Sequence, residues 1–253
     1  MSPLAIALLV LACTLGAAFS GMFLHAKLPD RHLVTESQDV VKLVMGLIAT
    51  MAALVLSLLI ASANSVHDAQ ITELKAASAN IVLLDRTLEF YGPEARAARD
   101  ALRNIVRQTH DRVWVTSRVR IENLNSIRTQ DAAKSVTARI LSLSPHTDLQ
   151  RTLKNHAIDQ AGSIMRSRLL MLEQMGSPIS WPFLVVLIFW IGVLFLGFGL
   201  FARFNATVAV ALTIGALSVT AAIFLILELG DPYGGFMRIS DQPVLDALAE
   251  IDR

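Results

Sequence analysis

The clearest chemical pattern in the sequence is a set of small or weakly polar residues that recur every three or four positions in an apolar run. They are Gly46, Thr50, Ala53, Ser57, Ala61 and, at the end of the run, Asn64. Small residues on one helical face let another helix approach closely, which is the usual way that helices pack in lipid. Hydroxyl groups on such a face can also coordinate ions weakly in a narrow conduit. The pattern therefore predicts a helix-packing or a pore-lining face. Packing is the simpler interpretation, and a pore neck could equally use Met51, Val55 and Leu58.

A second pattern is a run of arginines four residues apart, Arg99, Arg103 and Arg107. On a helix these side chains share one face and repel one another unless they are paired or face an anion. Acidic residues such as Asp100 and Asp111 are interleaved with them, so the simpler prediction is a solvated face with local ion pairs. The alternative is a basic vestibule that concentrates anions.

The remaining polar residues predict no catalytic, cofactor or metal site. The histidines have no metal-ligand spacing, Cys13 is the only cysteine, and no glycine-rich phosphate loop occurs. Glu228 and Asp231 stand at the end of an apolar run, where an interfacial position explains them without a proton relay. We therefore expect neither an enzyme nor a protein that binds nucleic acid.

The elements that hold these residues are predicted from the distribution of apolar residues. Hydrophobic residues make up 54% of the 253 residues and charged residues 17%. Four uncharged runs are long enough to cross a bilayer as helices, which takes about 20 residues each. They are residues 4–24, 43–63, 182–202 and 205–227. The prediction is an all-α membrane protein with two transmembrane hairpins, 1–63 and 181–229, and a C-terminal tail, 230–253.

Residues 64–180 are predicted to form a soluble helical insert between the second and third membrane helices. No glycine or proline interrupts residues 64–90, and apolar residues recur there at helical spacing. The second membrane helix should therefore continue into the insert and end at Gly92, which favours a helix C-cap. Farther along, Asp148 is predicted as the N-cap of a long helix.

The first run could instead be a cleaved signal peptide, but no Lys or Arg precedes it and it is longer than a typical signal core. Four crossings place the insert and both termini on one side of the membrane. The short first loop holds Lys27 and Arg31, so the rule that basic loops face the cytoplasm is nearly neutral here.

The chain resembles the bacterial bestrophin-like integral-membrane family. The matching stretches include "KLPDRHL", "DVVKLVMGLIATMAALVLSLLIASA", "LLDRTLEFYGPEARAARDALR" and "PFLVVLIFWIGVLFLGFGLFARFNATV". In that family the fourth helix ends with an acidic residue, a proline-aromatic pair and a glycine. Asp231, Pro232, Tyr233 and Gly234 occupy this turn, with the acidic residue displaced by one position.

The resemblance implies a multi-pass protein of the bacterial inner membrane with a cytoplasmic insert. It also implies a homo-oligomeric channel or pore for inorganic ions, with a pentamer as one form and the second helix near the axis. The competing hypothesis is a membrane-anchored helical scaffold that binds a partner without conducting ions.

Overall fold

The structure, a computed structural model, describes residues 2–27, 35–115, 135–175, 181–202 and 205–252. These residues are almost entirely helical and contain no β-strand. The labelled α-helices are α1 (Pro3–Lys27), α2 (Thr35–Tyr91), α3 (Arg96–His110), α6 (Asp148–Met175), α7 (Trp181–Phe201), α8 (Ala206–Leu229) and α9 (Gln242–Ile251). Residues 135–141 are also helical. Two short elements flank α3: a 3₁₀ turn η2 (Pro93–Ala95) and a π turn η3 (Asp111–Val115).

The chain divides into two compact units. Unit 1 comprises Met1–Ser65 and Pro178–Gly230, and unit 2 comprises Val66–Ser177 and Asp231–Arg253. Helix α2 contributes its first part to unit 1 and its second part to unit 2.

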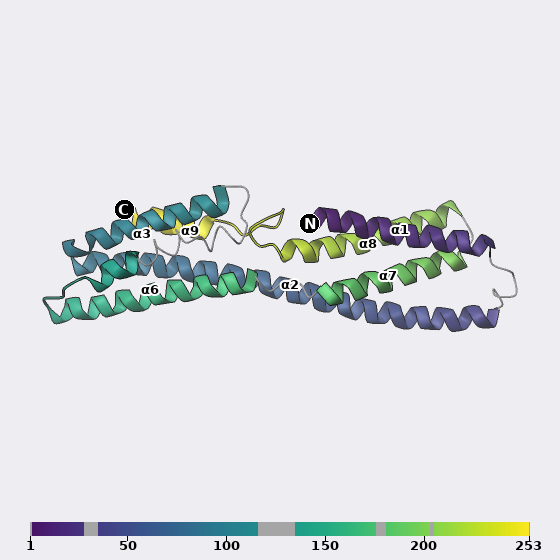
Figure 1. Cartoon of the computed structure of the whole chain (residues 1–253), viewed down its shortest axis with the longest axis horizontal. Helices are drawn as coiled ribbons and strands as arrows, with labels where there is room; N and C mark the ends of the chain where they lie inside the picture. The colour runs from purple at the N-terminus through teal and green to yellow at the C-terminus, as the bar shows by residue number, and fades with distance from the viewer. Residues whose placement is uncertain (1, 28–34, 116–134, 176–180, 203–204, 253) are drawn as a thin grey trace. The chain divides into compact units, whose positions relative to one another are not determined.

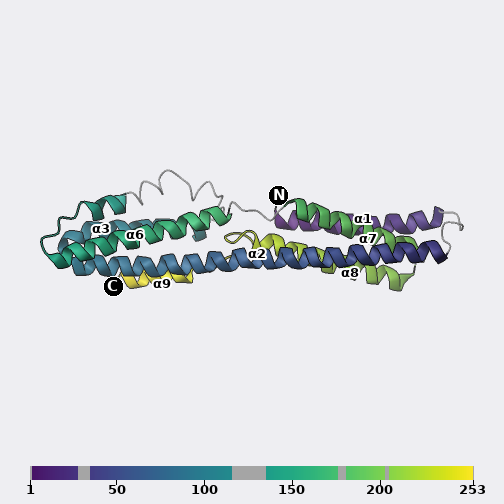
Figure 2. The same ribbon diagram turned by 90° about the horizontal axis from the view of Figure 1, so that it is seen from below.

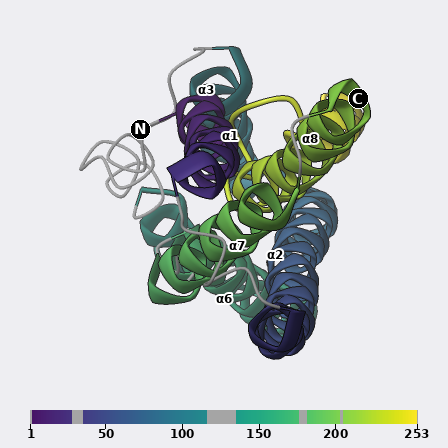
Figure 3. The same cartoon turned by 90° about the vertical axis from the view of Figure 1, so that its right-hand side faces the viewer.

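Unit 1 contains the membrane helices. Among the described residues, four helices are long and apolar enough to cross a bilayer: α1, α2, α7 and α8. Their lengths and composition confirm the prediction of an all-α membrane protein, although the turn around Arg203 lies outside the described residues. Within the unit, α1 packs most extensively against α7 and also against α8 (Figures 1 and 3).

The close approach of α1 to α7 depends on two glycines. A Cβ atom added to Gly21 of α1 would collide with the carbonyl oxygen of Leu196 and lie 2.8 Å from the amide nitrogen of Leu200. A Cβ atom added to Gly199 of α7 would collide with the carbonyl oxygen of Ala18. Because all of these are backbone atoms, α1 and α7 can be this close only where side chains are absent.

Helix α2 is 57 residues long and ends where the sequence predicts. The residue after it, Gly92, has φ 121°, a backbone conformation that L-residues rarely adopt. The amide of Gly92 donates to the carbonyl of Glu89 at 3.2 Å. The glycine thus ends the helix and starts the turn into η2.

Unit 2 is a helical bundle around the second part of α2, with α3, α6 and α9 running beside it (Figures 1 and 2). Its core contains buried side chains from each of these elements, including Leu84, Leu102, Ala157 and Ile251, together with Ile140 from the helical residues 135–141. Residues from Asp231 onward, predicted as a separate tail, belong to this bundle, because α9 buries its apolar face there.

The predicted cap at Asp148 is wrong by one residue. The Thr147 hydroxyl accepts the backbone N–H of Gln150 at 3.1 Å, and the Thr147 carbonyl accepts that of Arg151. Thr147 is therefore the N-cap, and Asp148 is the first helical residue, where its carboxylate pairs with Arg151 at 3.1 Å.

Candidate functional site

The described residues of the chain do not cover the small-residue face of α2. All six residues of the predicted set are exposed in unit 1 or at its boundary: Gly46, Thr50, Ala53, Ser57, Ala61 and Asn64. No atom outside the local helix lies within 4 Å of the point that a Cβ atom of Gly46 would occupy. Among the described parts of one chain, these small residues therefore do not serve as the packing face of α2.

Helix α2 packs through a different face. Met45, Ala52, Leu59 and Ala63 are buried against the rest of unit 1. The Met45 side chain lies against Gly197 of α7, with its sulfur 2.6 Å from the position that a Cβ atom would take. These four residues follow helical spacing, and the small residues lie away from them on the helix.

Helix α2 is the least covered of the four membrane helices. In its most apolar 18-residue stretch, 17% of the residues are buried, compared with 22% in α8, 33% in α1 and 39% in α7. Large side chains are exposed beside the small ones, among them Leu47 at 62% and Leu54 at 68%. Helix α2 thus carries the largest share of residues that a lipid or another subunit could cover.

The hydroxyl of Thr50 has a defined orientation on this face. It donates to the carbonyl of Gly46 at 2.7 Å, as a threonine often does within its own helix. The other residues considered for a pore neck differ in exposure: Met51 and Leu58 are exposed, whereas Val55 packs against the core of unit 1. The exposed face therefore combines hydroxyl and apolar side chains.

The arginine run lies on α3 in unit 2, and Arg99 forms its most buried ion pair. The Arg99 Nε donates to Oδ1 of Asp85 at 2.9 Å and Nη2 donates to Oδ2 at 2.7 Å. The Asp85 side chain is 2% exposed and that of Arg99 is 19% exposed. The hydrogen bonds from this carboxylate raise the pKa of Arg99 above its ordinary value. This bidentate pair connects α2 to α3.

The other two arginines of the run have different partners. Arg103 pairs with Asp100 at 3.8 Å, one helical turn away, and Arg107 pairs with Asp252, after α9, at 2.5 Å. Each arginine thus has a carboxylate beside it, and the three do not converge on a common point. Ion pairs therefore account for the run, as in the simpler of the two interpretations, but only the pair of Arg103 is local to α3.

The two acidic residues near the end of α8 differ in burial. Glu228 is 4% exposed, whereas Asp231 is exposed at the start of the turn that follows the helix. Both stand at the end of a membrane helix, so an interfacial position stays our prediction for them. Among the residues that the structure describes, no group of three His, Cys, Asp or Glu side chains could hold a metal ion.

Several interactions were not predicted from the sequence. The Tyr233 hydroxyl donates to Oε1 of Gln70 at 3.2 Å, and the Gln70 amide donates to the carbonyl of Met171 at 2.9 Å. Gln70 is fully buried, so these bonds satisfy an amide that would otherwise be costly inside the bundle. The sequence offered one signal for these bonds: Gln70 lies among the regularly spaced apolar residues of α2, where a polar side chain needs a partner.

Comparison with known proteins gives one family and one fold. The family model described as "Bestrophin-like domain" matches residues 12–244. A search of curated proteins found no match. The chain is similar in fold to solved structures of a bacterial bestrophin homologue from Klebsiella pneumoniae, each with a single substitution. One has a TM-score of 0.71 at 13% identity, with 99% of this chain and 97% of that chain covered. Another has a TM-score of 0.63 at 15% identity, with 97% and 96% covered.

Proposed function

The chain belongs to the bestrophin-like family, and from that membership we propose that it forms a homo-oligomeric ion channel or pore in which the exposed face of α2 lies nearest the axis. The observation that supports this most is the exposure of Gly46, Thr50, Ala53, Ser57 and Ala61 on the least buried membrane helix. Lipid offers no reason to place hydroxyl and small residues together on one face. Copies of α2 around an axis would use them for close packing and for an aqueous path.

The proposed conduit is built from weak ligands. Hydroxyl oxygens such as those of Thr50 and Ser57 can replace part of an ion's hydration, and apolar side chains such as Leu54 can form a gate by dewetting. A pentamer is one arrangement that brings five copies of α2 together. We propose that the protein is multi-pass in the bacterial inner membrane, with unit 2 and both termini in the cytoplasm and inorganic ions as its cargo.

The first test is a flux assay with matched substitutions. We expect Ser57→Leu to lower ion flux into liposomes by about tenfold or more, the change that follows when a constriction adds about 1.4 kcal/mol to a barrier. The control is Ser218→Leu on α8, because Ser218 is also an exposed serine on a membrane helix. That variant should conduct like the unchanged chain.

Three outcomes would contradict the proposal. A strictly monomeric chain in detergent would have no symmetry axis for a pore. Equal losses of ion flux in the Ser57→Leu and Ser218→Leu variants would show that α2 does not line the pore. An oligomer that passes no cation or anion at any pH or voltage, and that retains a specific protein partner, favours the scaffold hypothesis instead.

A further inference from the structure

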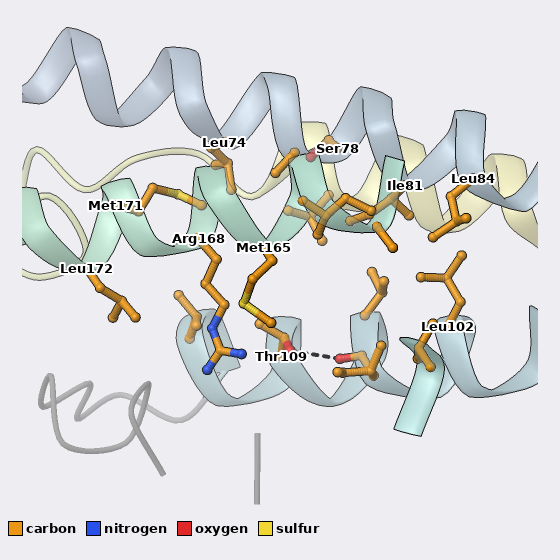
Figure 4. Close-up of a pocket in the computed structure, with 18 of the residues that line it drawn as sticks. Leu74, Ser78, Ile81, Leu84, Leu102, Thr109, Met165, Arg168, Met171 and Leu172 are labelled. Carbon is orange, nitrogen blue, oxygen red and sulfur yellow. Dashed lines mark hydrogen bonds between the residues drawn. The ribbon is translucent and has the colours of Figure 1, made fainter. Parts of the chain in front are cut away.

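Unit 2 contains a cavity between α2, α3 and α6 that the proposed channel does not use. Its volume is about 200 Å³. Most of its lining is apolar, with Leu74, Ile81, Leu102 and Met165 among the residues that Figure 4 labels. An apolar cavity of about 150 Å³ in a protein can stay dry and bind benzene. The space is therefore sufficient for one molecule of about the size of a substituted aromatic ring.

A few polar groups face this apolar space. Ser78 of α2 is 5% exposed, and its hydroxyl has no hydrogen-bond partner among the described residues. Arg168 of α6 is the only charged side chain among the described residues that line the cavity. Figure 4 shows it extending from α6 toward the end of α3 near Thr109, whose hydroxyl donates to the carbonyl of Ile105 at 2.8 Å. The cavity thus has one cationic group and one unused hydroxyl.

The Arg168 side chain is half-buried beside the cavity. Burial lowers its pKa, because the removal of water disfavours the charged form. An anion bound beside the guanidinium would oppose this effect. Tyr233, which also lines the cavity, has its pKa raised to about 12 by burial, so it stays neutral and adds no competing negative charge.

One wall of the cavity is fixed by aromatic contacts. Trp114 stacks on His110 with ring centroids 5.7 Å apart and meets Tyr233 edge to face at 5.9 Å. Its Nε1 donates to the carbonyl of Ile239 at 3.0 Å. Because three contacts hold the indole in place, the wall is formed before any ligand binds, and binding would require little ordering of it.

We propose that this cavity binds a small apolar monocarboxylate, of the size of a benzoate, with its ring or chain among the apolar side chains and its carboxylate at Arg168. A planar guanidinium is the side chain best suited to a carboxylate, which it can bind through two hydrogen bonds. Ser78 supplies a further hydrogen-bond donor or acceptor. The adaptable side chains of Met165 and Met171 would fit around the ligand body. This proposal does not rest on the proposed channel.

Trp114 provides a local probe of the site. The chain has three tryptophans, and Trp181→Phe with Trp190→Phe leaves Trp114 as the only one. We would titrate this full-length protein in lipid nanodiscs with 4-bromobenzoate, whose bromine quenches an indole that it contacts. The expected result is saturable quenching. A parallel titration with 6-bromohexanoate compares the affinities for an aromatic and an aliphatic acid. Tighter binding of 4-bromobenzoate indicates an aromatic metabolite, and tighter binding of 6-bromohexanoate indicates a fatty acid.

Substitutions then identify the binding groups. Arg168→Gln should weaken the binding of 4-bromobenzoate about tenfold or more, because it removes a charge-assisted hydrogen bond. Arg166→Gln is the matched control, since Arg166 is an exposed arginine two residues away that does not line the cavity. The neutral 4-bromobenzyl alcohol should bind equally to both variants, and Ala161→Met, which fills the cavity, should abolish saturation.

Two results would overturn the proposal: quenching that never saturates with either acid, or an equal affinity of the Arg168→Gln and Arg166→Gln variants for 4-bromobenzoate. If the single-tryptophan background does not fold, equilibrium dialysis of radiolabelled benzoate against the unchanged chain and the two arginine variants makes the same comparison. Ion flux is not a readout of either assay, so a failure here leaves the channel proposal standing.

Discussion

Replacing Asp85 with alanine is expected to lower the free energy of unfolding of unit 2 by about 3–5 kcal/mol, the usual result of removing one partner from a buried ion pair. The Asp85 side chain is 2% exposed and accepts two hydrogen bonds from Arg99. Without it, the guanidinium of Arg99 remains largely buried at the contact between α2 and α3. The measurement is the fraction of protein that stays monodisperse in detergent after heating.

The matched control is Arg86→Gln. Arg86 is adjacent in sequence and pairs with Glu89 at 2.9 Å and with Glu250, but these side chains are 36–42% exposed. Exposed ion pairs contribute little because water already solvates both groups. We expect Arg86→Gln to melt like the unchanged chain. The double substitution Asp85→Leu with Arg99→Met should regain part of the loss, since it leaves no buried charge. If Asp85→Ala and Arg86→Gln melt alike, the buried pair does not hold the bundle together.

The sequence was sufficient to predict the membrane helices and the residue at which α2 ends. A continuous run of about 20 apolar residues can cross lipid only as a helix. Residues 64–90 contain no glycine or proline, so no helix-breaking residue precedes Gly92. Both signals are local. The positive φ of Gly92 shows that the turn needed the residue that the sequence placed there.

The helical faces that other helices bury could not be predicted from such local signals. Periodicity identified the small residues of α2 from Gly46 to Ala61, and helix packing was the simpler interpretation. In the structure the close packing occurs at Gly21 and Gly199, and the small residues of α2 are exposed. A repeat of small residues shows that a close approach is allowed, but the partner depends on the positions of all the helices.

The ion pairs of α3 show the same limit. The sequence predicted local pairs for Arg99 and Arg107, yet their partners are Asp85, from α2, and Asp252, which follows α9. Asp85 occurs beside the apolar positions Leu84 and Leu88, so a buried carboxylate could have been inferred from the spacing. The pairing of Asp252 with Arg107 could not have been inferred, because these residues meet only when α9 packs in the bundle.

Gly199→Ala is expected to destabilise unit 1 by about 1–3 kcal/mol or more, the usual penalty of overpacking, because the added methyl group would meet backbone. The Cβ atom would collide with the carbonyl oxygen of Ala18 and lie 3.1 Å from the amide nitrogen of Met22, so α1 and α7 would have to separate. Flexible side chains could move aside, but these backbone atoms are fixed by the hydrogen bonds of α1.

The controls for this prediction come from the same two helices. Nothing lies within 4 Å of a Cβ atom added to Gly16 of α1 or to Gly192 of α7. Alanine is the better helix former by about 1 kcal/mol, so Gly16→Ala and Gly192→Ala should leave stability unchanged or raise it. The measurement is the amount of protein that stays monodisperse after heating. A loss of stability for Gly199→Ala with no loss, or a gain, for Gly192→Ala would separate a steric effect from helix propensity. A loss of the same size at all three positions would show that the α1–α7 contact is looser than its geometry indicates.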